Sequence, residues 1–440
     1  MTTTLQEKQG YKKTELGWIP DEWDIHLLSN LGYTYSGLSG KGKDDFGTGK
    51  AFITYMNIFK NVFIDKNCFA YVKIKPGEAQ NKVQLWDILF TTSSETPDEV
   101  GMASVLLDDI DELYLNSFCF GFRLHNFETL YPQFAGYYFR GCFFRNILNK
   151  LAQGATRYNL SKNNLLKSKI YLPSFNEQQK IAEILSSIDK KIDFVDKQIG
   201  QAEQLKKALM QELLTKGIGH TEFKDTEIGS IPKGWEVKKL QKLLDNNTVI
   251  KHLDGNHGEL YPKSEEFVNE GVPYIGANSI LGRNVNFKVC KYLNEERAAK
   301  FIKGVAYDGD VLFASNATVG PVAILKTHLE YIILSTTLTF YRCDLERLNN
   351  YFLAYYMKSP LFINQYERLM KQTTRNQLPI TTQRTLYFIL PSIEEQKEIA
   401  EILNTADNKL EILQNKKSEY EKLKKGLMQK LLTGQIRVRM

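Results

Sequence analysis

The stretch LPSFNEQQKIAEIL at residues 172–185 recurs as LPSIEEQKEIAEIL at residues 390–403. Shifting the sequence against itself by 218 positions aligns residues 172–218 with residues 390–436 without a gap, with roughly half of the positions identical. A second match, at an offset of 212, pairs YKKTELGWIPDEWDIHLL from Tyr11 with FKDTEIGSIPKGWEVKKL from Phe223. Because such matches bracket both halves, we interpret the chain as a diverged tandem duplication.

Both copies of the repeat predict a long helix. Ser174 with Glu177, and Ser392 with Glu395, form the S-x-x-E capping box directly after a proline, where the two side chains can satisfy free backbone N–H groups. Glycines near the ends of both repeats are plausible C-terminal stops. A helix of about 40 residues would be roughly 60 Å long.

Apolar residues in both predicted helices follow the spacing of a coiled-coil seam. The seam residues are Leu185, Ile188, Ile192, Val195, Ile199 and Ala202 in the first copy, and Leu403, Ala406, Leu410, Leu413 and Tyr420 in the second. The spacing slips after Ala202, as in a local break of heptad phase. So narrow an apolar stripe on so long a helix predicts a partner helix.

Two arrangements of the long helices are compatible with this pattern. Each helix could pack on its own globular domain. Alternatively, a compact domain with adjacent termini would leave helix one and enter helix two at nearly the same point, so the helices would run antiparallel. We favour the second arrangement, in which one coiled coil holds two heads apart with pseudo-twofold symmetry.

The resulting fold class is α/β (α+β), with two β-rich heads that also contain packed helices. We expect residues 1–171 to form head 1, 172–218 the central long helix, 219–389 head 2, and 390–440 the C-terminal long helix and tail. Strand-like stretches rich in β-branched and aromatic residues open each head. Aromatic residues at helical spacing close it, and we interpret these as core.

Basic and polar residues gather in the predicted loops of the heads. Lys and Arg neutralise phosphates, and Arg, Asn and Gln can read base edges, although most charged loop residues are simply solvated. The candidate nucleic-acid-binding residues are Lys41, Lys43, Lys50, Thr54, Tyr55, Asn57 and Arg157 in head 1, and Tyr274, Asn278, Arg283, Asn316 and Arg375 in head 2.

No catalytic motif stands out in the sequence. GLSGKGKD from Gly37 resembles a phosphate-binding loop, but Asp44 replaces the Ser or Thr that binds magnesium and no apolar strand precedes it. The Asn-Pro-Pro-Tyr tetrapeptide, which is typical of the amino-methyltransferase pocket that holds a flipped base, does not occur. The histidines do not have the spacing of metal ligands. We therefore expect a protein without a catalytic site, cofactor-binding site or metal site of its own.

Bulk properties narrow the class of protein further. The 440 residues, 42% hydrophobic, favour several folded domains, and the net charge of +6 is compatible with nucleic-acid binding. Five scattered cysteines without a CxxC pair argue against a disulfide framework. No signal peptide or membrane span is apparent, so we expect a cytoplasmic protein without a membrane partner.

Taken together, the twin LPSxxEQ stretches, the following LKKALMQELLTKG and LKKGLMQKLLTG, and the LGWIPDEW and IGSIPKGW segments resemble the specificity subunit of type I DNA restriction-modification systems. The resemblance covers essentially the whole chain. It implies that the heads are target recognition domains, each reading one half of a bipartite, asymmetric site in double-stranded DNA. A twofold pair of heads would meet half-sites about one helical turn, roughly 34 Å, apart.

The same resemblance implies the partners. Two modification (methyltransferase) subunits would dock on the paired helices and bring S-adenosylmethionine and adenine methylation, and restriction subunits would add ATP- and Mg-dependent translocation and cleavage. Thr156 with Arg157, and Thr374 with Arg375, match the Thr-Arg pair that commonly precedes the last strand of a head, where it could position DNA or close the head.

Two other functions remain open from the sequence. The chain could be the recognition subunit of a bipartite type II methyltransferase-nuclease, or a coiled-coil scaffold with two protein-binding heads.

Overall fold

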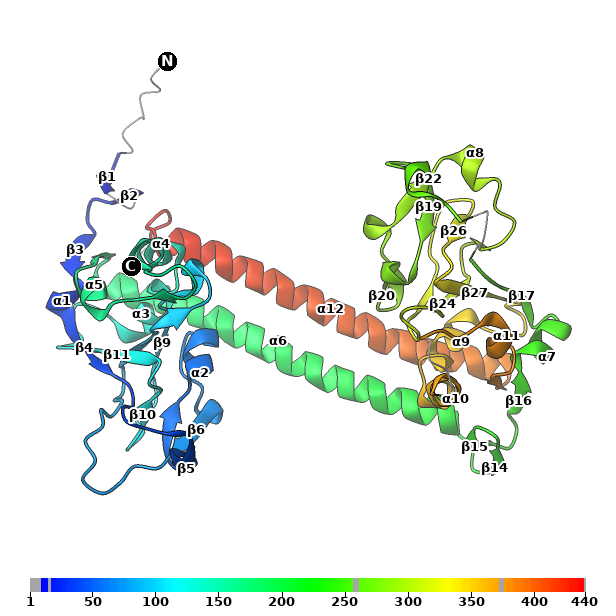
Figure 1. The fold of residues 1–440 in the computed structure, drawn as a ribbon, viewed down its shortest axis with the longest axis horizontal. Helices are drawn as coiled ribbons and strands as arrows, with labels where there is room; N and C mark the ends of the chain where they lie inside the picture. The colour runs from blue at the N-terminus through cyan, green and yellow to red at the C-terminus, as the bar shows by residue number, and fades with distance from the viewer. Residues whose placement is uncertain (1–8, 15–16, 256–260, 372–375, 439–440) are drawn as a thin grey trace, which may run out of the picture. The chain divides into compact units, whose positions relative to one another are not determined.

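The computed structural model describes residues 9–14, 17–255, 261–371 and 376–438, and its chain divides into two compact units. Unit 1 comprises Met1–Asp196 and Asn415–Met440, and unit 2 comprises Lys197–Gln414. The unit boundaries fall inside the two long helices, α6 (Phe175–Lys216) and α12 (Ile393–Leu431). One part of each long helix therefore belongs to unit 1 and the other part to unit 2. The other elements belong to one unit alone (Figure 1).

Unit 1 contains head 1, which is rich in short strands. Its strands are β1 (Tyr11–Thr14), β2 (Gly17–Pro20), β3 (Asp24–Leu27), β4 (Gly32–Ser36), β5 (Phe46–Ile53), β6 (Phe69–Val72), β7 (Ile88–Thr91), β8 (Ser93–Ser94), β9 (Ala103–Val105), β10 (Tyr114–Leu115), β11 (Cys119–Leu124), β12 (Tyr158–Asn159) and β13 (Lys169–Leu172). Its short helices are α1 (Leu28–Leu31), α2 (Tyr55–Lys60), α3 (Pro132–Tyr138), α4 (Cys142–Leu151) and α5 (Lys162–Leu166).

Unit 2 contains head 2, built in the same way. Its strands are β14 (Phe223–Thr226), β15 (Gly229–Pro232), β16 (Glu236–Lys239), β17 (Val249–Asp254), β18 (Phe267–Val268), β19 (Val272–Ile275), β20 (Ile280–Leu281), β21 (Asn284–Val285), β22 (Lys291–Leu293), β23 (Val305–Ala306), β24 (Val311–Ala314), β25 (Val322–Ile324), β26 (Ile332–Leu334), β27 (Leu338–Cys343) and β28 (Tyr387–Leu390). Its short helices are α7 (Leu240–Asp245), α8 (Glu295–Ala298), α9 (Asn350–Tyr356), α10 (Pro360–Met370) and α11 (Ile380–Gln383).

The two heads share one sheet topology, as a duplication predicts. A four-stranded antiparallel sheet has the order β4-β11-β7-β9 in head 1 and β17-β27-β24-β25 in head 2. Beside it, β5 pairs with β10 in parallel and β19 pairs with β26 in parallel. The neighbouring sheets differ in size, with three strands in head 1 and five in head 2 among the described residues.

A buried ion pair recurs in the two heads, at the start of the similar sequences DILF (residues 87–90) and DVLF (residues 310–313). Asp87 accepts two hydrogen bonds from Arg123, at 2.8 and 2.7 Å, and Asp310 accepts two from Arg342, at 2.9 and 2.7 Å. Both aspartates are almost fully buried, and a buried carboxylate needs such a partner. The pair therefore connects the two central strands of each four-stranded sheet.

The aromatic residues that close each head are core, as predicted. In head 1, Phe134, Tyr138 and Phe144 of α3 and α4 are buried, and in head 2 Tyr356 and Phe362 of α9 and α10 are buried too. Their rings pack on the four-stranded sheet and on the start of α6 or α12 in the main hydrophobic cluster of each unit.

The prediction of two long helices is confirmed, with 42 residues in α6 and 39 in α12. The serine of each capping box caps its helix, because the Glu177 and Glu395 N–H groups donate to Ser174 and Ser392 Oγ at 3.4 and 3.2 Å. The reciprocal half of the capping box was wrong. The two glutamate carboxylates instead bind residues that follow the end of the other long helix.

These junctions use the same glutamate for different partners. In unit 1, Glu177 accepts two hydrogen bonds from Arg437 of the C-terminal tail, at 2.8 and 2.9 Å. In unit 2, Glu395 accepts from Trp235 Nε1 at 2.9 Å and from the Ile218 N–H at 3.0 Å, and it contacts His220 at 2.9 Å. Each glutamate therefore ties the start of one long helix to the chain that leaves the other.

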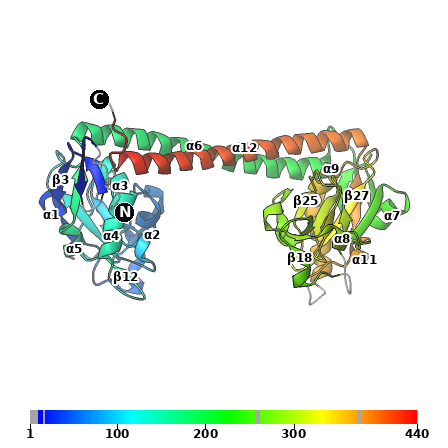
Figure 2. The ribbon, with the colours of Figure 1, turned by 90° about the horizontal axis from the view of Figure 1, so that it is seen from above.

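Within each unit, α6 and α12 pack side by side (Figures 1 and 2). In unit 1, Asp189 pairs with Lys424, and Asp196, seven residues later, pairs with Lys417, seven residues earlier. The helices are therefore antiparallel there. Lys206 of unit 2 pairs with residue 407 in the same register.

The cores of the heads differ at one buried site. In head 2, Gln383 Oε1 accepts hydrogen bonds from Tyr341 Oη at 2.6 Å and Thr339 Oγ1 at 3.0 Å, and lies 3.1 Å from His252 Nε2. His252 is 2% exposed. Head 1 has Leu165 in the place of Gln383, at the offset of 218.

This polar core predicts acid sensitivity in head 2. Burial lowers the pKa of His252 to about 4, whereas an unfolded histidine titrates near 6.5. The contribution of neutral His252 to the folding stability of head 2 is therefore complete above the unfolded pKa of about 6.5, and it is lost as the pH falls from 6.5 toward 4. At pH 5, head 2 should lose ~2 kcal/mol of stability from this group.

Hydrogen exchange of the full chain tests this prediction. Peptides from β17 and β27 should lose protection between pH 7 and pH 5, after correction for the intrinsic exchange rate, while the matching β4 and β11 peptides of head 1 serve as the internal control. Equal pH dependence of the two sets would contradict it.

Candidate nucleic-acid interface

Two of the candidate residues in head 1 lie close together. The β8–β12 ladder pairs Ser94 with Tyr158, and the Tyr55 hydroxyl donates to the Ser93 carbonyl at 2.7 Å. Exposed Arg157 directly precedes β12. Burial raises the pKa of Tyr55, and the charge of Arg157 is near enough to oppose that rise. Tyr55 and Arg157 therefore flank the same short ladder.

Head 2 has the corresponding ladder with different residues. Asn316 forms an isolated bridge with Gln377, and the Asn376 side-chain amide donates to the Ala317 carbonyl at 2.7 Å. Ala317 has φ +64, a left-handed conformation that is unusual for a residue with a side chain. Arg375, the match of Arg157, lies outside the described residues.

Several candidates in head 1 have structural partners. Lys41, with only 5% of its side chain exposed, donates to the Lys73 carbonyl and Glu78, both at 2.6 Å. This contact, together with backbone and glutamine donors, lowers the pKa of Glu78 to about 2. Exposed Lys50 forms an ion pair with Glu112. The ammonium groups of Lys41 and Lys50 are therefore paired with carboxylates of head 1 itself.

Two other head 1 candidates organise helix α2 and its loop. Thr54 caps α2 by accepting from the Asn57 N–H at 3.2 Å. Buried Asn57 donates to the Asp65 carbonyl at 2.8 Å and accepts from the Asp65 N–H at 3.0 Å. Lys43, by contrast, is exposed in the turn before β5.

The head 2 candidates divide in the same way. Arg283 donates to Asn408 and Glu411 of α12, both at 2.7 Å, so it links the β20–β21 hairpin to the long helix. Tyr274 is 7% exposed, and its hydroxyl has no hydrogen-bond partner among the described residues. Asn278 is exposed in a turn between β19 and β20.

The predicted seam residues are buried or half-buried along both long helices. Leu185, Val195 and Leu403 are at most 1% exposed, and Ile192 and Tyr420 are intermediate. Their assignment to a continuous coiled-coil interface stays a prediction.

The sequence reasoning missed two grooves, one in each unit. In unit 1, a groove of about 970 Å³ lies between Arg140–Cys142 and the long helices. In unit 2, a groove of about 910 Å³ lies between the Lys358–Pro360 turn and the long helices. At the offset of 218 their helix residues match as Asp189 and Asp407, Ile192 and Leu410, Asp193 and Glu411, Glu421 and Glu203, Lys424 and Lys206, Lys425 and Lys207, Met428 and Met210, and Gln429 and Gln211.

Each groove is framed by the same three-residue network. Asp189 accepts from Tyr137 Oη at 2.7 Å and from Lys424 at 2.5 Å. Asp407 accepts from Tyr355 Oη at 2.7 Å and from Lys206 at 2.5 Å. Identity at the offset of 218 was the sequence signal that could have revealed it.

Comparison with known proteins gives a consistent result. Residues 42–204 and 232–422 match the family model described as type I restriction modification DNA specificity domain. The chain is 30% identical to the MjaX specificity subunit of Methanocaldococcus jannaschii, over 98% of both chains. It is also 33% identical to the type I restriction enzyme MjaVIII specificity subunit of that organism, over 62% of this chain and 63% of the relative.

Solved structures share the fold. The S subunit of a type I restriction-modification system from M. genitalium superposes with a TM-score of 0.57 at 16% identity, over 100% of both chains. A chain from a study of assembly and conformational transition of the type I R-M system gives a TM-score of 0.56 at 18% identity, over 95% of this chain and 99% of that one. Separately, none of the helices in the described part of the chain is long and apolar enough to cross a membrane.

Truncation of Asn57 and of Arg157 should change the free energy of unfolding by very different amounts, because Asn57 is buried and hydrogen-bonded and Arg157 is exposed. Asn57→Ala leaves the Asp65 N–H and carbonyl without their partner, so the free energy of unfolding should fall by ~1–3 kcal/mol. Arg157→Ala removes an exposed side chain and should change it by less than ~0.5 kcal/mol. Urea denaturation of the full chain measures both, and a neutral Asn57→Ala variant would refute the structural role.

Proposed function

Because this chain belongs to the family of type I restriction-modification DNA specificity subunits, the non-catalytic subunits of these systems, we propose that each head reads one half of a bipartite DNA site. The observation that carries the proposal is a shared scaffold with unlike surfaces. Both heads have the same four-stranded sheet order, yet the short ladder of head 1 is formed by Ser93, Ser94, Tyr158 and Asn159, whereas the corresponding one of head 2 is formed by Asn316, Ala317, Asn376 and Gln377. Different residues on equal scaffolds suit different half-sites.

We assign the reading role to the exposed candidates Arg157, Lys43 and Asn278, and to half-buried Asn316. Arg157 and Lys43 in head 1, and Asn278 and Asn316 in head 2, have side chains of the types that contact phosphates or base edges. Arg157 would pair with a phosphate or a guanine, since a guanidinium suits either. Lys41, Asn57 and Arg283 would act indirectly, by holding the loops and hairpins that carry the readers.

The duplicated grooves support two copies of one partner. Their helix residues are nearly the same set, with acidic, basic, amide and methionine side chains at matching positions. A partner that fits one groove therefore fits the other. We propose that one modification subunit docks at each, that S-adenosylmethionine and the adenine chemistry belong to these subunits, and that ATP and Mg belong to a restriction subunit.

Exchange of one head tests the reading function. The segment from Phe223 to Leu390 would be replaced by that of another specificity subunit in a host that carries this chain and its neighbouring methyltransferase. Mapping of methylated adenines should then find one half of the bipartite target changed and the other unchanged. A change in both halves, or in neither, would overturn one head per half-site.

Charge reversal in the grooves tests the docking of two partners. Lys425→Glu and Lys207→Glu alter exposed, matched residues, so each single variant should lose one copy of the modification subunit and the double variant both. Each change should weaken its site about tenfold, as expected for the loss of one or two ion pairs, so the altered site is largely empty at a partner concentration near the Kd of the unaltered site. Native mass spectrometry of the reconstituted complex counts the copies.

The matched control is Lys422→Glu, an exposed lysine of α12 outside the groove lining. It should bind both copies with unchanged affinity. Two bound copies in the Lys425→Glu, Lys207→Glu double variant would refute docking at the grooves.

A further inference from the structure

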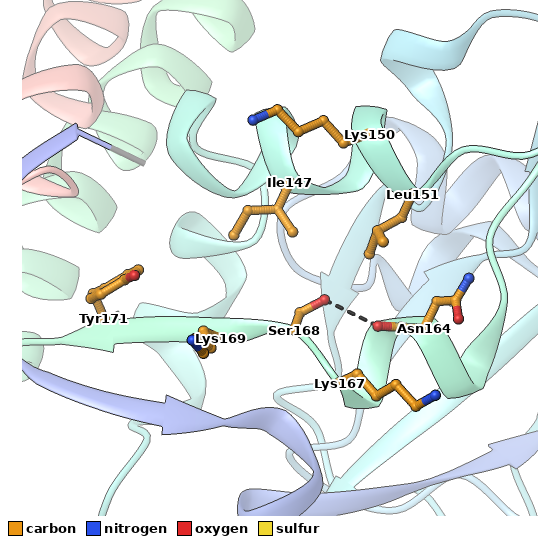
Figure 3. Close-up of a pocket in the computed structure, with 8 residues that line it drawn as sticks. All are labelled: Ile147, Lys150, Leu151, Asn164, Lys167, Ser168, Lys169 and Tyr171. Atoms are coloured by element: carbon orange, nitrogen blue, oxygen red, sulfur yellow. Dashed lines mark hydrogen bonds between the residues drawn. The ribbon is translucent and has the colours of Figure 1, made fainter. Parts of the chain in front are cut away.

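Head 1 carries a pocket whose lining includes none of the candidate DNA-binding residues. It has a volume of about 330 Å³ and lies between α4, α5 and β13 (Figure 3). Ile147 and Leu151 project from α4 toward β13, where Ser168 and Tyr171 form the opposite wall. Ser168 Oγ is engaged with the Asn164 carbonyl at 3.2 Å. The floor of the pocket is therefore mainly apolar.

The rim of the pocket is positively charged. Lys150, Lys167 and Lys169 all line it and are exposed. Lys150 lies on the α4 side and Lys167 on the opposite side (Figure 3). None of the described side chains that line the pocket is acidic. An anionic ligand is thus favoured at the rim.

The apolar surface continues beyond the pocket onto the β3–β13 ladder. The register pairs Lys169 with Leu27 and Tyr171 with Ile25, and side chains directly opposite each other in an antiparallel ladder share a face. Ile25 is 52% exposed and Leu27 is 38% exposed. Pocket and strand face therefore form one amphipathic surface, which we call the lysine-rimmed patch.

The corresponding elements of head 2 do not form this patch among the residues that the structure describes there. Gln365 takes the place of Ile147 at the offset of 218, and its amide donates to the Tyr387 carbonyl at 3.1 Å and accepts from the Tyr387 N–H at 2.8 Å. Thr385 takes the place of Lys167, and Lys239, in the place of Leu27, lies over the Tyr387 ring at 5.3 Å. The patch is therefore a property of head 1 and not of the shared fold.

We propose that the lysine-rimmed patch binds an acidic, amphipathic segment of a partner protein, one segment per chain. Carboxylates of the segment meet Lys150 and Lys167, while its apolar side chains cover Ile147 and Leu151 and extend onto the β3–β13 face. Charge complementarity selects an acidic ligand, and the apolar floor selects a peptide.

Duplex DNA fits the patch less well than a peptide does. Phosphates would satisfy the lysines, but a sugar-phosphate backbone offers little apolar surface to cover Ile147, Leu151 and Ile25. Burial of apolar area is the main favourable term in protein association. The single copy also contrasts with the duplicated grooves. Two copies of a partner that dock in the two grooves would find this patch on head 1 only. The patch would therefore distinguish head 1 from head 2 for that partner.

Fluorescence anisotropy with the full chain tests the proposal. The probe is a fluorescein-labelled synthetic peptide of alternating glutamate and leucine, and the comparison ligands are the lysine–leucine peptide and a duplex that lacks the methylation target. The test variant carries Ile147→Gln and Lys167→Thr, the residues that head 2 has at these positions. A second variant carries Lys167→Thr alone, which alters only an exposed side chain.

The glutamate–leucine peptide should bind one per chain, and the double variant should weaken it about tenfold, with a smaller loss for Lys167→Thr. Lys66→Thr, an exposed lysine elsewhere in head 1, is the matched control and should leave binding unchanged, and thermal melting confirms that all variants fold. Two peptides per chain, equal binding of the lysine–leucine peptide, unchanged affinity in both patch variants, or a loss confined to the duplex would overturn the proposal.

Discussion

One aspartate in each unit joins three parts of the molecule. Asp189 accepts hydrogen bonds from Tyr137 of head 1 and Lys424 of α12, while its own backbone belongs to α6. Asp407 does the same on α12 for Tyr355 and Lys206. A half-buried carboxylate loses much of its hydration, so it is stable only when charged and hydrogen-bonded partners surround it. Burial and the neighbouring aspartate raise the pKa of both tyrosines, which stay protonated donors.

This network constrains the register of the long helices and the seating of the heads together. A shift of α6 by one residue would separate Asp189 from Lys424 and also from the hydroxyl of Tyr137. In unit 2, the same shift would separate Asp407 from Lys206 and from the hydroxyl of Tyr355. The same shifts of register are therefore unfavourable in both units. We call the two long helices and the Tyr–Asp–Lys network of each unit the frame. The same contacts specify the frame in both units, while residues that do not contact it are free to differ between the heads.

The differences between the heads occur at residues that do not contact the frame. A polar core around Gln383 replaces the Leu165 site, and a closed Gln365–Tyr387 contact replaces the pocket beside Ile147. Neither change reaches the Asp–Arg pair of the central sheet or the Tyr–Asp–Lys network. Tandem duplication therefore provides two stable scaffolds whose surfaces can diverge independently, which suits the reading of an asymmetric site.

Much of the frame could be predicted from sequence, because periodicity and repetition carry it. The two long helices, their antiparallel pairing within each unit and the β-rich heads follow from capping serines, heptad spacing and the repeat offset. The candidate site was less predictable, because residue type does not reveal burial or partners. Lys41 and Asn57 have the chemistry of DNA-binding residues but hold loops, and Tyr274 is buried. Comparing the halves position by position would have identified Asp189 and Asp407 as frame residues.

The central claim is that the Tyr–Asp–Lys network fixes the antiparallel register of the two long helices within each unit. Double electron–electron resonance between spin labels at Gln179→Cys and Lys422→Cys, exposed residues of α6 and α12 in unit 1, measures that register directly after replacement of the native exposed cysteines by serine. The chain with an intact network should give a single narrow distance distribution, and Asp189→Ala should broaden it or shift its mean, because the variant loses the contacts with Tyr137 and Lys424. A broad distribution with the network intact, or a distribution that Asp189→Ala leaves unchanged, would contradict the account.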